Sequence, residues 1–562
     1  MVFDRLMAMK EILYDILKSA LNKTINSGEI SIPKIPSFAV EKPREGKFGD
    51  FYTNLAMVVA PQASKKPRDV ANLIINNLNG HAKIISKVEI AGPGFINFFM
   101  TQDFWLEALR EVIKKGNEYG SLTIGANEKI QVEFVSANPT GPLHVGHGRG
   151  AVIGDVLANI LKKAGYDVLK EYYINDVGLQ METLGRSTLI RYRQLLGEQI
   201  EFPENGYKGD YINDIAKDII LKKGKHFLQM PEKESIPFFI EFTAAVILEG
   251  IKKDLEDFGV RFDHWYSEKT LHERGMVDKV VGWLRDKDFI YEKDDALWLK
   301  ASAFGDEKDR VVRRGTGYYT YLASDIAYHK EKYERGFKKV INIWGADHHG
   351  YVPRMRSAIK ALGFDEKSFS VLLVQLVNLK KGGQILSMST RSGEFTELSQ
   401  VIKEVGKDAT RFFCMMRSSD SHLDFDLDLA KKQSSENPVY YVQYAHARIR
   451  SIFRQAEENK LQDLNLEICN LKLLKLPEEL SIIKKILAFP ELIERMALSL
   501  EPHLITHYLL DLCGEFHSYY KKHRLISDDK DLTAARLMLI KALGVVIENS
   551  LDILGVAAPE EM

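Results

Sequence analysis

Hydrophobic positions divide the chain into three parts with different periodicities. From Lys129 onward, apolar runs of strand length, such as IQVEFVSA and SVLLVQLVNL, alternate with segments of helical periodicity, which is typical of a parallel α/β sheet. The segment after Val145 keeps helical apolar spacing until Gly165, so a strand, a turn and a helix outline a nucleotide-binding βαβ unit. Residues from about 183 to 270 are richer in charge and in helical pattern, which predicts an insertion (183–270) into this sheet domain.

The two ends of the chain differ from the middle. Residues 1–118 run from a helix through a proline-punctuated stretch to short β-like pieces, which predicts a small N-terminal α+β module. Residues 435–562 show periodic apolar helices without a strand pattern, which predicts a C-terminal all-helical bundle. The predicted fold is therefore multidomain α/β, with a nucleotide-binding, Rossmann-like parallel sheet domain over residues 119–434 between the two.

Composition limits the partners and the compartment. Lys and Arg total 77 against 78 Asp and Glu among 562 residues, so no global positive field exists and any nucleic acid must bind a local surface. Cys414, Cys469 and Cys513 form no CxxC pair, which excludes a disulfide framework and a sulfur-based zinc site. The start lacks the unbroken apolar centre of a signal peptide, and no apolar run approaches the ~18 residues of a membrane helix. The sequence therefore predicts a cytoplasmic protein with no membrane partner.

The segment ANPTGPLHVGHGRG, residues 137–150, lies where the first predicted strand of the sheet domain gives way to a helix. A helix N-terminus has unpaired N–H groups and a positive dipole end, both of which favour phosphate oxygens. His144 and His147 are three residues apart and can donate to one phosphate group, while Gly146 lets an adenine or ribose approach the backbone. The alternative is a helix start at which two polar histidines hydrogen-bond locally.

Together with the preceding VEFVS, this segment resembles the first signature of class I aminoacyl-tRNA synthetases and related nucleotidyl transferases, which activate their substrates as adenylates. The segment ILSMSTRSGEF, at 385–395, occupies the place of the second signature. It matches that Lys-Met-Ser-Lys-Ser pattern at Met388 and Ser389, and the resemblance implies that both residues bind ATP. The alternative is a polar surface loop.

Two positions of the second signature depart from the family pattern, because Ser387 and Thr390 stand where lysines are usual. A lysine there supplies positive charge to the leaving pyrophosphate, so another group is expected to do so. Arg391 is the first candidate, because its planar fork can hold two phosphate oxygens, and Lys380 and Lys381 in the preceding turn are the others. Alternatively, Arg391 is a solvated loop charge and magnesium alone suffices.

Segments similar to arginyl-tRNA synthetase extend over nearly the whole chain, in YYINDVGLQ, DIAYHKEKYERGF, GADHHGYVPR and the final LGVAAPEEM. GKFGDFYTNLA, which contains Asn54, resembles the family's tRNA-elbow domain, and NPVYYVQYAHARIRSI resembles its anticodon-binding helical domain. The resemblance implies tRNA contacts for Asn54. Tyr440, Tyr441 and Tyr444 share one helix stripe that suits base stacking, with hydroxyl-rimmed core packing as the alternative.

A pocket for arginine needs acceptors, preferably carboxylates, because a guanidinium carries five N–H donors and a fixed charge. By resemblance, Glu133 and Asn138 hold the α-amino group and backbone end of the substrate. Tyr321 and Asp325 match the guanidinium contacts, and their spacing of four puts both on one helix face; otherwise Asp325 is an ordinary surface acid. Val352 stands where many relatives place a glutamine beside the guanidinium.

Gly345, Asp347 and His348 follow a predicted strand and, by resemblance, line the adenosine side of the site. The DHH sequence also admits a metal site, but no further cluster of suitable ligands accompanies it. No protein-bound metal is therefore predicted, and magnesium is expected to arrive with ATP.

The sequence thus predicts an arginine–tRNA ligase that activates L-arginine with ATP and Mg²⁺ and transfers it to the 3′ end of tRNA(Arg). A monomer without a tightly bound cofactor is expected, and the resemblance implies that arginine activation needs bound tRNA. Two alternatives stay open. One is a catalytically weak relative that binds tRNA as a regulator, and the other is a small-metabolite adenylyltransferase, which leaves both ends of the chain unexplained.

Overall fold

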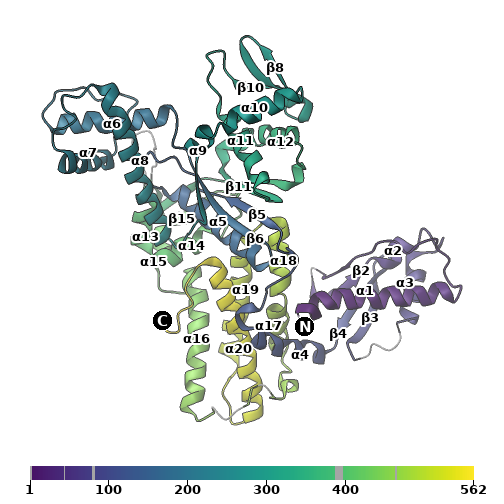
Figure 1. The fold of residues 1–562 in the computed structure, drawn as a ribbon. Helices are drawn as coiled ribbons and strands as arrows, with labels where there is room; N and C mark the ends of the chain where they lie inside the picture. The colour runs from purple at the N-terminus through teal and green to yellow at the C-terminus, as the bar shows by residue number, and fades with distance from the viewer. Residues whose placement is uncertain (1–2, 44, 79–82, 387–395, 462–464, 467) are drawn as a thin grey trace.

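The computed structural model describes residues 3–43, 45–78, 83–386, 396–461, 465–466 and 468–562. Figure 1 shows three parts: an N-terminal module that projects to one side, a central sheet domain with a helical lobe, and a helical bundle beneath the sheet domain. The predicted multidomain α/β fold is confirmed.

The N-terminal module contains an antiparallel sheet with the strand order β1-β2-β4-β3. Its elements are α1 (Phe3–Asn26), β1 (Val40–Glu41), η1 (Gly46–Phe48), β2 (Phe51–Thr53), α2 (Leu55–Val59), α3 (Pro67–Asn76), β3 (Ile85–Ala91), β4 (Phe95–Met100), α4 (Gln102–Lys115) and η2 (Gly116–Glu118). Helix α4 leaves the module and packs on the bundle. Lys10 and Lys42 of the module also form ion pairs with Glu491 of the bundle, at 2.8 and 2.6 Å.

The middle domain is built on a parallel sheet with the strand order β12-β11-β5-β6-β7. Its strands are β5 (Lys129–Glu133), β6 (Asp167–Ile174), β7 (His264–Ser267), β11 (Lys339–Gly345) and β12 (Phe369–Val374). Apolar side chains on one face pack with helix α5 (Val145–Lys163), and those on the other face pack with α11 (Tyr321–Glu334) and α12 (Val352–Ala361). The sheet therefore separates two hydrophobic cores, and the neighbouring residues Val340 and Ile341 of β11 face different cores.

Helix α5 lies very close to the end of β5. A Cβ at Gly154 would lie 2.2 Å from the Phe134 ring, so only glycine allows this approach. Thirteen of the residues of α5 are buried, which fixes the orientation of its first turn relative to the sheet.

A helical lobe lies between β6 and β7 in the chain and consists of α6 (Leu179–Leu195), α7 (Asp210–Lys223) and α8 (Glu232–Asp257). This lobe falls largely within the insertion expected at about 183–270. Strand β7, which lies in the same range, pairs in parallel with β6 and is part of the central sheet. Its four residues, HWYS, are too few and too polar at their ends to stand out as a buried strand.

After β7 the chain forms a smaller sheet with the order β10-β9-β8, which the apolar pattern did not predict. This region contains α9 (Glu268–Glu273), α10 (Met276–Asp286), β8 (Ile290–Lys293), β9 (Ala296–Leu299), η3 (Ala301–Phe304) and β10 (Arg310–Arg313). The strands are short, and several of their residues are only half-buried.

The run SVLLVQLVNL forms two strands rather than one. Gln375 and Leu376 separate β12 from the next strand, and Leu376 is 70% exposed. A third sheet, β14-β13-β15, follows. The elements of this region are η4 (Ala346–Tyr351), η5 (Glu366–Ser368), β13 (Val377–Lys381), β14 (Gln384–Ile385), α13 (Leu398–Val405), α14 (Lys407–Cys414), β15 (Leu423–Asp426) and α15 (Leu427–Lys431).

The described residues from 438 onward contain helices and no strand, which confirms the predicted bundle. The elements are α16 (Pro438–Glu458), η6 (Leu471–Leu473), α17 (Pro477–Leu487), α18 (Phe489–Ser499), α19 (Leu504–Lys522) and α20 (Lys530–Leu554). Helices α18 and α20 pack directly on α5, so the bundle and the sheet domain share one core. Among the described residues, no helix has both the length and the apolar character to span a membrane.

Candidate functional site: a carboxylate-lined cavity beside the HVGH helix

The first turn of α5 follows the bend after β5, and His144 is its N-cap. The N–H groups of Gly146 and His147 donate to His144 Nδ1 (3.1 and 3.4 Å), and the His144 N–H donates to His147 Nδ1 (3.3 Å). The two rings stack with their centroids 3.7 Å apart. The local hydrogen bonding that was the alternative for these histidines therefore exists, and it fixes both rings at the start of the helix.

Both histidines are neutral near pH 7. Burial lowers the pKa of His144, and burial together with His144 lowers the pKa of His147 to about 3. Because each Nδ1 accepts a hydrogen bond, the proton of each neutral ring lies on Nε2. Gly146 is needed between them, because a Cβ would lie 2.9 Å from the His144 ring. The start of the helix therefore carries two neutral rings, each with its N–H at Nε2.

A cavity of about 410 Å³ opens at the carboxyl ends of β5 and β11, on the side of the sheet that α11 covers. We call it the sheet-edge cavity. All four residues that were expected to bind arginine line it, as do two of the residues expected on the adenosine side: Glu133, Asn138, Tyr321, Asp325, Gly345 and His348. Parallel sheets commonly bind ligands at this edge.

Glu133, at the end of β5, is one of three carboxylates at the cavity. It is buried, with Lys332 Nζ 2.5 Å from its Oε2, and Ser136 Oγ donates to its Oε1 (3.2 Å). Lys332 has no solvent exposure, so it supplies the positive charge that makes burial of this carboxylate possible. Lys332 was not predicted from the sequence, although its spacing of seven from Asp325 places both on one face of α11.

The bend that connects Glu133 to Asn138 holds strained backbone. Val135 has a φ of 67° and Ser136 a φ of 40°, in the left-handed region that a β-branched valine rarely adopts. Both residues line the sheet-edge cavity. Asn138 Nδ2 donates to Gln180 Oε1 of α6 (2.6 Å), which ties the bend to the helical lobe.

Asp325 lies one turn after Tyr321 on α11 and accepts a hydrogen bond from the Tyr351 hydroxyl. Burial raises the pKa of Asp325 to about 7; the Tyr351 hydrogen bond opposes this rise, and the charges of Glu268 and Glu133 add to it. Tyr321 is 63% exposed at the cavity. At neutral pH the Asp325 carboxyl is therefore close to half-protonated, and a bound cation would favour its ionised form.

Glu268 is the third carboxylate, and the sequence analysis missed it. It is the first residue of α9, directly after β7, and it lines the cavity although it is only 3% exposed. Burial raises its pKa, and His272 Nε2 lies 3.5 Å from its Oε1. An acid directly after a sheet strand is a signal for a binding residue. Here the strand lay within the expected insertion and was not assigned to the sheet, so the signal was not used.

The expected adenosine-side residues lie at the end of β11. Gly345 ends the strand, and a Cβ there would lie 2.5 Å from Asp347 Oδ1. Asp347 and His348 follow in η4 with exposed side chains, 3.7 Å apart at their nearest charged atoms. In the described part of the chain, no group of three or more His, Cys, Asp and Glu side chains could hold a metal ion.

Met388, Ser389 and Arg391 lie outside the described residues, so their roles stay predictions. The chain on the C-terminal side of this segment contacts the first signature, because the Leu398 N–H donates to Leu143 O (2.8 Å). His144 and Glu397 also form an isolated antiparallel bridge, so the chain that follows the second signature pairs with the start of α5.

Lys380 and Lys381, the other candidates for the missing lysine, both have acidic partners. Lys380 Nζ lies 2.6 Å from Asp424, and Lys381 Nζ lies 2.7 Å from Glu404. Both lysines therefore already have an acidic partner, and Arg391 as the substitute for the signature lysine stays a prediction.

The three tyrosines of α16 line a second cavity, of about 550 Å³, which we call the tyrosine cavity. The rings of Tyr440 and Tyr444 stack with centroids 6.0 Å apart. The Arg448 guanidinium lies 4.5 Å from the Tyr444 ring and 4.6 Å from the Tyr520 ring. Tyr440 is half-buried and Tyr444 is exposed, whereas Tyr441 is half-buried and packs against the core, so the role of the stripe in stacking bases stays a prediction.

Asn54 is half-buried before α2, and its Oδ1 accepts the Ala39 N–H (3.0 Å). This bond holds two parts of the N-terminal module together. Contact of Asn54 with tRNA stays a prediction.

Family models match the chain in three consecutive stretches. The arginyl tRNA synthetase N terminal domain matches residues 11–100, the tRNA synthetases class I (R) catalytic domain matches 108–423, and the DALR anticodon binding domain matches 442–562. A parallel sheet, a histidine-capped helix at its edge and these matches define a class I aminoacyl-tRNA synthetase.

Full-length relatives narrow the class further. The arginine–tRNA ligase of Geobacter sp. strain M21 is 51% identical over 99% of this chain and 100% of the relative, and that of Syntrophotalea carbinolica is 50% identical over the same shares. The chain belongs to the arginyl-tRNA synthetase family, whose ligases join arginine to tRNA with ATP. The solved Thermus thermophilus arginyl-tRNA synthetase, 22% identical, has the same fold, with a TM-score of 0.74 over 98% of this chain and 100% of that chain.

Proposed function

We propose that the sheet-edge cavity binds L-arginine, with the guanidinium at Asp325, Glu268 and Tyr321 and the α-ammonium at Glu133 and Asn138. One observation carries the proposal: three carboxylates from three separate elements converge on one cavity, with a single buried lysine as counter-charge. A guanidinium and an ammonium bring the two positive charges that this set lacks. A neutral or singly charged amino acid would leave a buried carboxylate unpaired.

ATP, as its Mg²⁺ complex, is proposed to lie across the start of α5. Its adenosine is directed to Gly345, Asp347 and His348. Because Gly146 has no Cβ, the adenosine can approach the helix backbone there. An oxygen of the arginine carboxylate attacks the α-phosphorus, and the bond to the bridging oxygen breaks so that pyrophosphate leaves with the electron pair. The Nε2–H groups of the two signature histidines donate to the α-phosphate oxygens as charge develops there, so positioning and electrostatics replace a protein nucleophile.

In the second step the terminal adenosine hydroxyl of tRNA(Arg) attacks the acyl carbon. The hydroxyl oxygen bonds to that carbon and its proton passes to a phosphate oxygen of the adenylate, while the bond between the acyl carbon and the phosphate oxygen breaks and AMP leaves with the electron pair. The chain must therefore hold the acceptor end near the sheet-edge cavity and the anticodon elsewhere, and the tyrosine cavity, with Arg448 stacked between two rings, suits unpaired bases.

Arginine-dependent exchange of pyrophosphate into ATP, measured with and without tRNA(Arg), tests the proposal. Exchange that depends on arginine and is not supported by lysine or citrulline supports it. If no amino acid supports exchange while tRNA still binds, the chain is the regulator considered above, an alternative that the family match and the intact cavity do not favour.

Replacing Tyr444 with alanine should raise KM for tRNA(Arg) in charging by about tenfold, because one stacking platform and one cation–π partner of Arg448 are removed. Steady-state aminoacylation with varied tRNA measures this. Tyr444→Phe keeps the ring and should stay within about twofold of the unmodified protein. An unchanged KM in Tyr444→Ala would place the anticodon elsewhere.

Arg391→Ala should lower the rate of adenylate formation by about tenfold or more, because Arg391 is proposed to replace the signature lysine at the leaving pyrophosphate. The double variant Lys380→Ala with Lys381→Ala serves as the matched control, since both lysines already pair with acids. A loss confined to the lysine variant would transfer the role to that turn, and no loss in either would mean that magnesium alone suffices.

We also propose that the protein acts as a monomer in the cytoplasm, where tRNA is charged. Both signatures, all three carboxylates and the tyrosine cavity are contributed by one chain, so the site needs no second copy. Light scattering after size exclusion measures the oligomeric state.

A further inference from the structure

Arg149 lies on α5 two residues after His147, and the proposed reaction does not use it. Its side chain has no solvent exposure. In the described part of the chain, all of its hydrogen bonds go to backbone carbonyls: Nη1 donates to Gln375 O (2.9 Å) and Ser421 O (2.8 Å), and Nη2 donates to Ser418 O (2.8 Å). Three carbonyl oxygens thus surround one buried guanidinium.

A second buried arginine shows how unusual this arrangement is. Arg411 also has no exposure and also donates to backbone carbonyls, those of Leu554 (2.7 Å) and Phe258 (3.2 Å), but it pairs in addition with the Asp155 carboxylate of α5 at 2.5 Å. A buried positive charge normally has such a partner, because its desolvation is costly. The environment of Arg149 therefore points to a specific role for its three carbonyl contacts.

The three carbonyls belong to the two segments that enter one strand pair. Gln375 lies just before β13, and Ser418 and Ser421 lie just before β15, which pairs in parallel with β13. The Gln375 N–H donates to Ser419 O (2.9 Å), so the segments also contact each other. One guanidinium on α5 therefore fixes the start of both strands.

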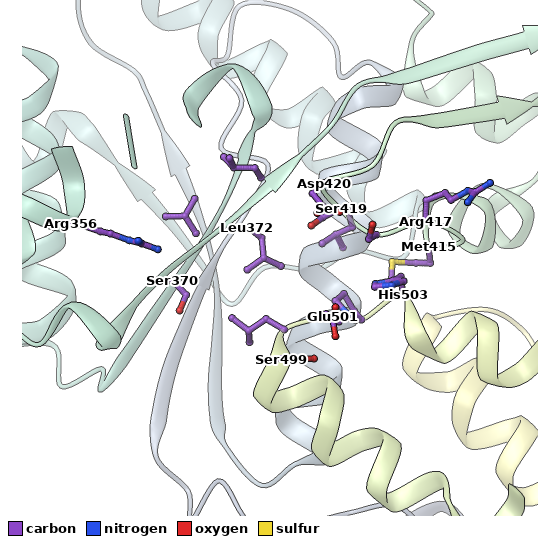
Figure 2. Close-up of a pocket in the computed structure, with 16 residues that line it drawn as sticks. Arg356, Ser370, Leu372, Met415, Arg417, Ser419, Asp420, Ser499, Glu501 and His503 are labelled. Carbon is purple, nitrogen blue, oxygen red and sulfur yellow. The ribbon is translucent and has the colours of Figure 1, made fainter. Parts of the chain in front are cut away.

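The segment that carries Ser418 borders a cavity whose lining also includes Ile153 of α5. Figure 2 shows Met415, Arg417, Ser419 and Asp420 beside a cavity of about 450 Å³ that separates this segment and β12 from the turn between α18 and α19. Because a cavity replaces packed side chains there, the position of the segment depends strongly on its bonds to α5.

We propose that Arg149 is a positioning residue for adenylate formation. It holds the β13–β15 pair against the first turn of α5, the turn that presents His144 and His147. Strand β13 leads through β14 into the second signature, and the Leu398 N–H to Leu143 O bond fixes the chain after it. Arg149 thus aligns the entry to the second signature with the helix that bears the first, and this inference rests on the reaction proposed above.

The test compares Arg149→Lys with Arg411→Lys in pyrophosphate exchange with saturating tRNA(Arg). Both variants keep a buried positive charge on the same core, but only Arg149 contacts the β13–β15 pair. In Arg149→Lys we expect kcat to fall about tenfold or more, with KM for arginine and for ATP within about threefold. In Arg411→Lys we expect kcat within about threefold, with thermal stability lowered as much as in Arg149→Lys.

Three results would overturn the inference: an unchanged kcat in Arg149→Lys, equal losses of kcat in both variants, or a loss carried only by KM. If Arg149→Lys does not fold, Arg149→Gln, which retains two N–H donors, is measured in the same assay at lower temperature with the same expectation for kcat. Absence of exchange in the unmodified protein would instead refute the proposed function, so the two failures are distinguishable.

Discussion

Replacing His147 with alanine is expected to lower kcat for adenylate formation by about 100-fold or more, with KM for arginine unchanged within about twofold. The reason is that the His147 Nε2–H is proposed to act on charge that develops at the α-phosphate, whereas arginine is proposed to bind in the sheet-edge cavity. Pyrophosphate exchange with varied arginine measures both constants.

The structure gives His147 a second task, because its Nδ1 accepts the His144 N–H and so completes the helix cap. His147→Asn separates the two tasks, since the asparagine Oδ1 keeps an acceptor near the position of Nδ1 and nothing replaces Nε2–H. We expect His147→Asn to lose as much rate as His147→Ala. Recovery of activity in His147→Asn would mean that the residue acts only through the cap.

Asp325→Asn is expected to weaken arginine binding by about 2 kcal/mol, or roughly thirtyfold, because a charge-assisted contact to the guanidinium becomes a neutral one. Titration calorimetry with arginine, or KM in exchange, measures the effect. Glu334→Gln, a change of the same kind on the same helix but away from the cavity, is the matched control and should leave arginine affinity unchanged. If Asp325→Asn binds arginine as tightly as the unmodified protein, the guanidinium lies elsewhere.

The same carboxyl predicts how arginine affinity varies with pH. Burial raises the pKa of Asp325 to about 7, so the empty site is largely protonated below pH 7, while the guanidinium requires the ionised form. Affinity should therefore fall by up to about tenfold between pH 7 and pH 6 and level off above pH 8. Asp325→Asn should remove most of this dependence, and any remainder belongs to Glu268, whose pKa burial also raises.

Local patterns were sufficient to predict the parts of the site that one element carries alone. The change from strand to helical periodicity located α5, and the spacing of His144 and His147 placed both rings at its start, where phosphate binding stays a prediction. The spacing of Tyr321 and Asp325 placed both on one face of α11, and both line the cavity. Each of these inferences needed only the geometry of a single helix.

The residues that were missed act across elements. Lys332 pairs with Glu133 only because α11 packs against β5, and no local sequence pattern indicates that contact. Glu268 follows a strand of four residues that joins the sheet after a long helical lobe, so its pairing with β6 is a tertiary event. Arg149 contacts backbone carbonyls, which every residue has, so no pattern of side chains in the sequence predicts these contacts.

The central sheet separates two cores, and this separation bears on how the enzyme's parts combine. The core that α5 shares with the bundle fixes the position of the helix that carries His147. The core of α11 and α12, on the opposite face of the sheet, fixes the position of the helix that carries Asp325. Side chains in different packing environments that share no partner affect free energy independently. The free-energy losses from replacing His147, the proposed phosphate donor, and Asp325, the proposed guanidinium acceptor, should therefore add. Substitutions on one face of the sheet could then change arginine affinity without changing the rate of adenylate formation.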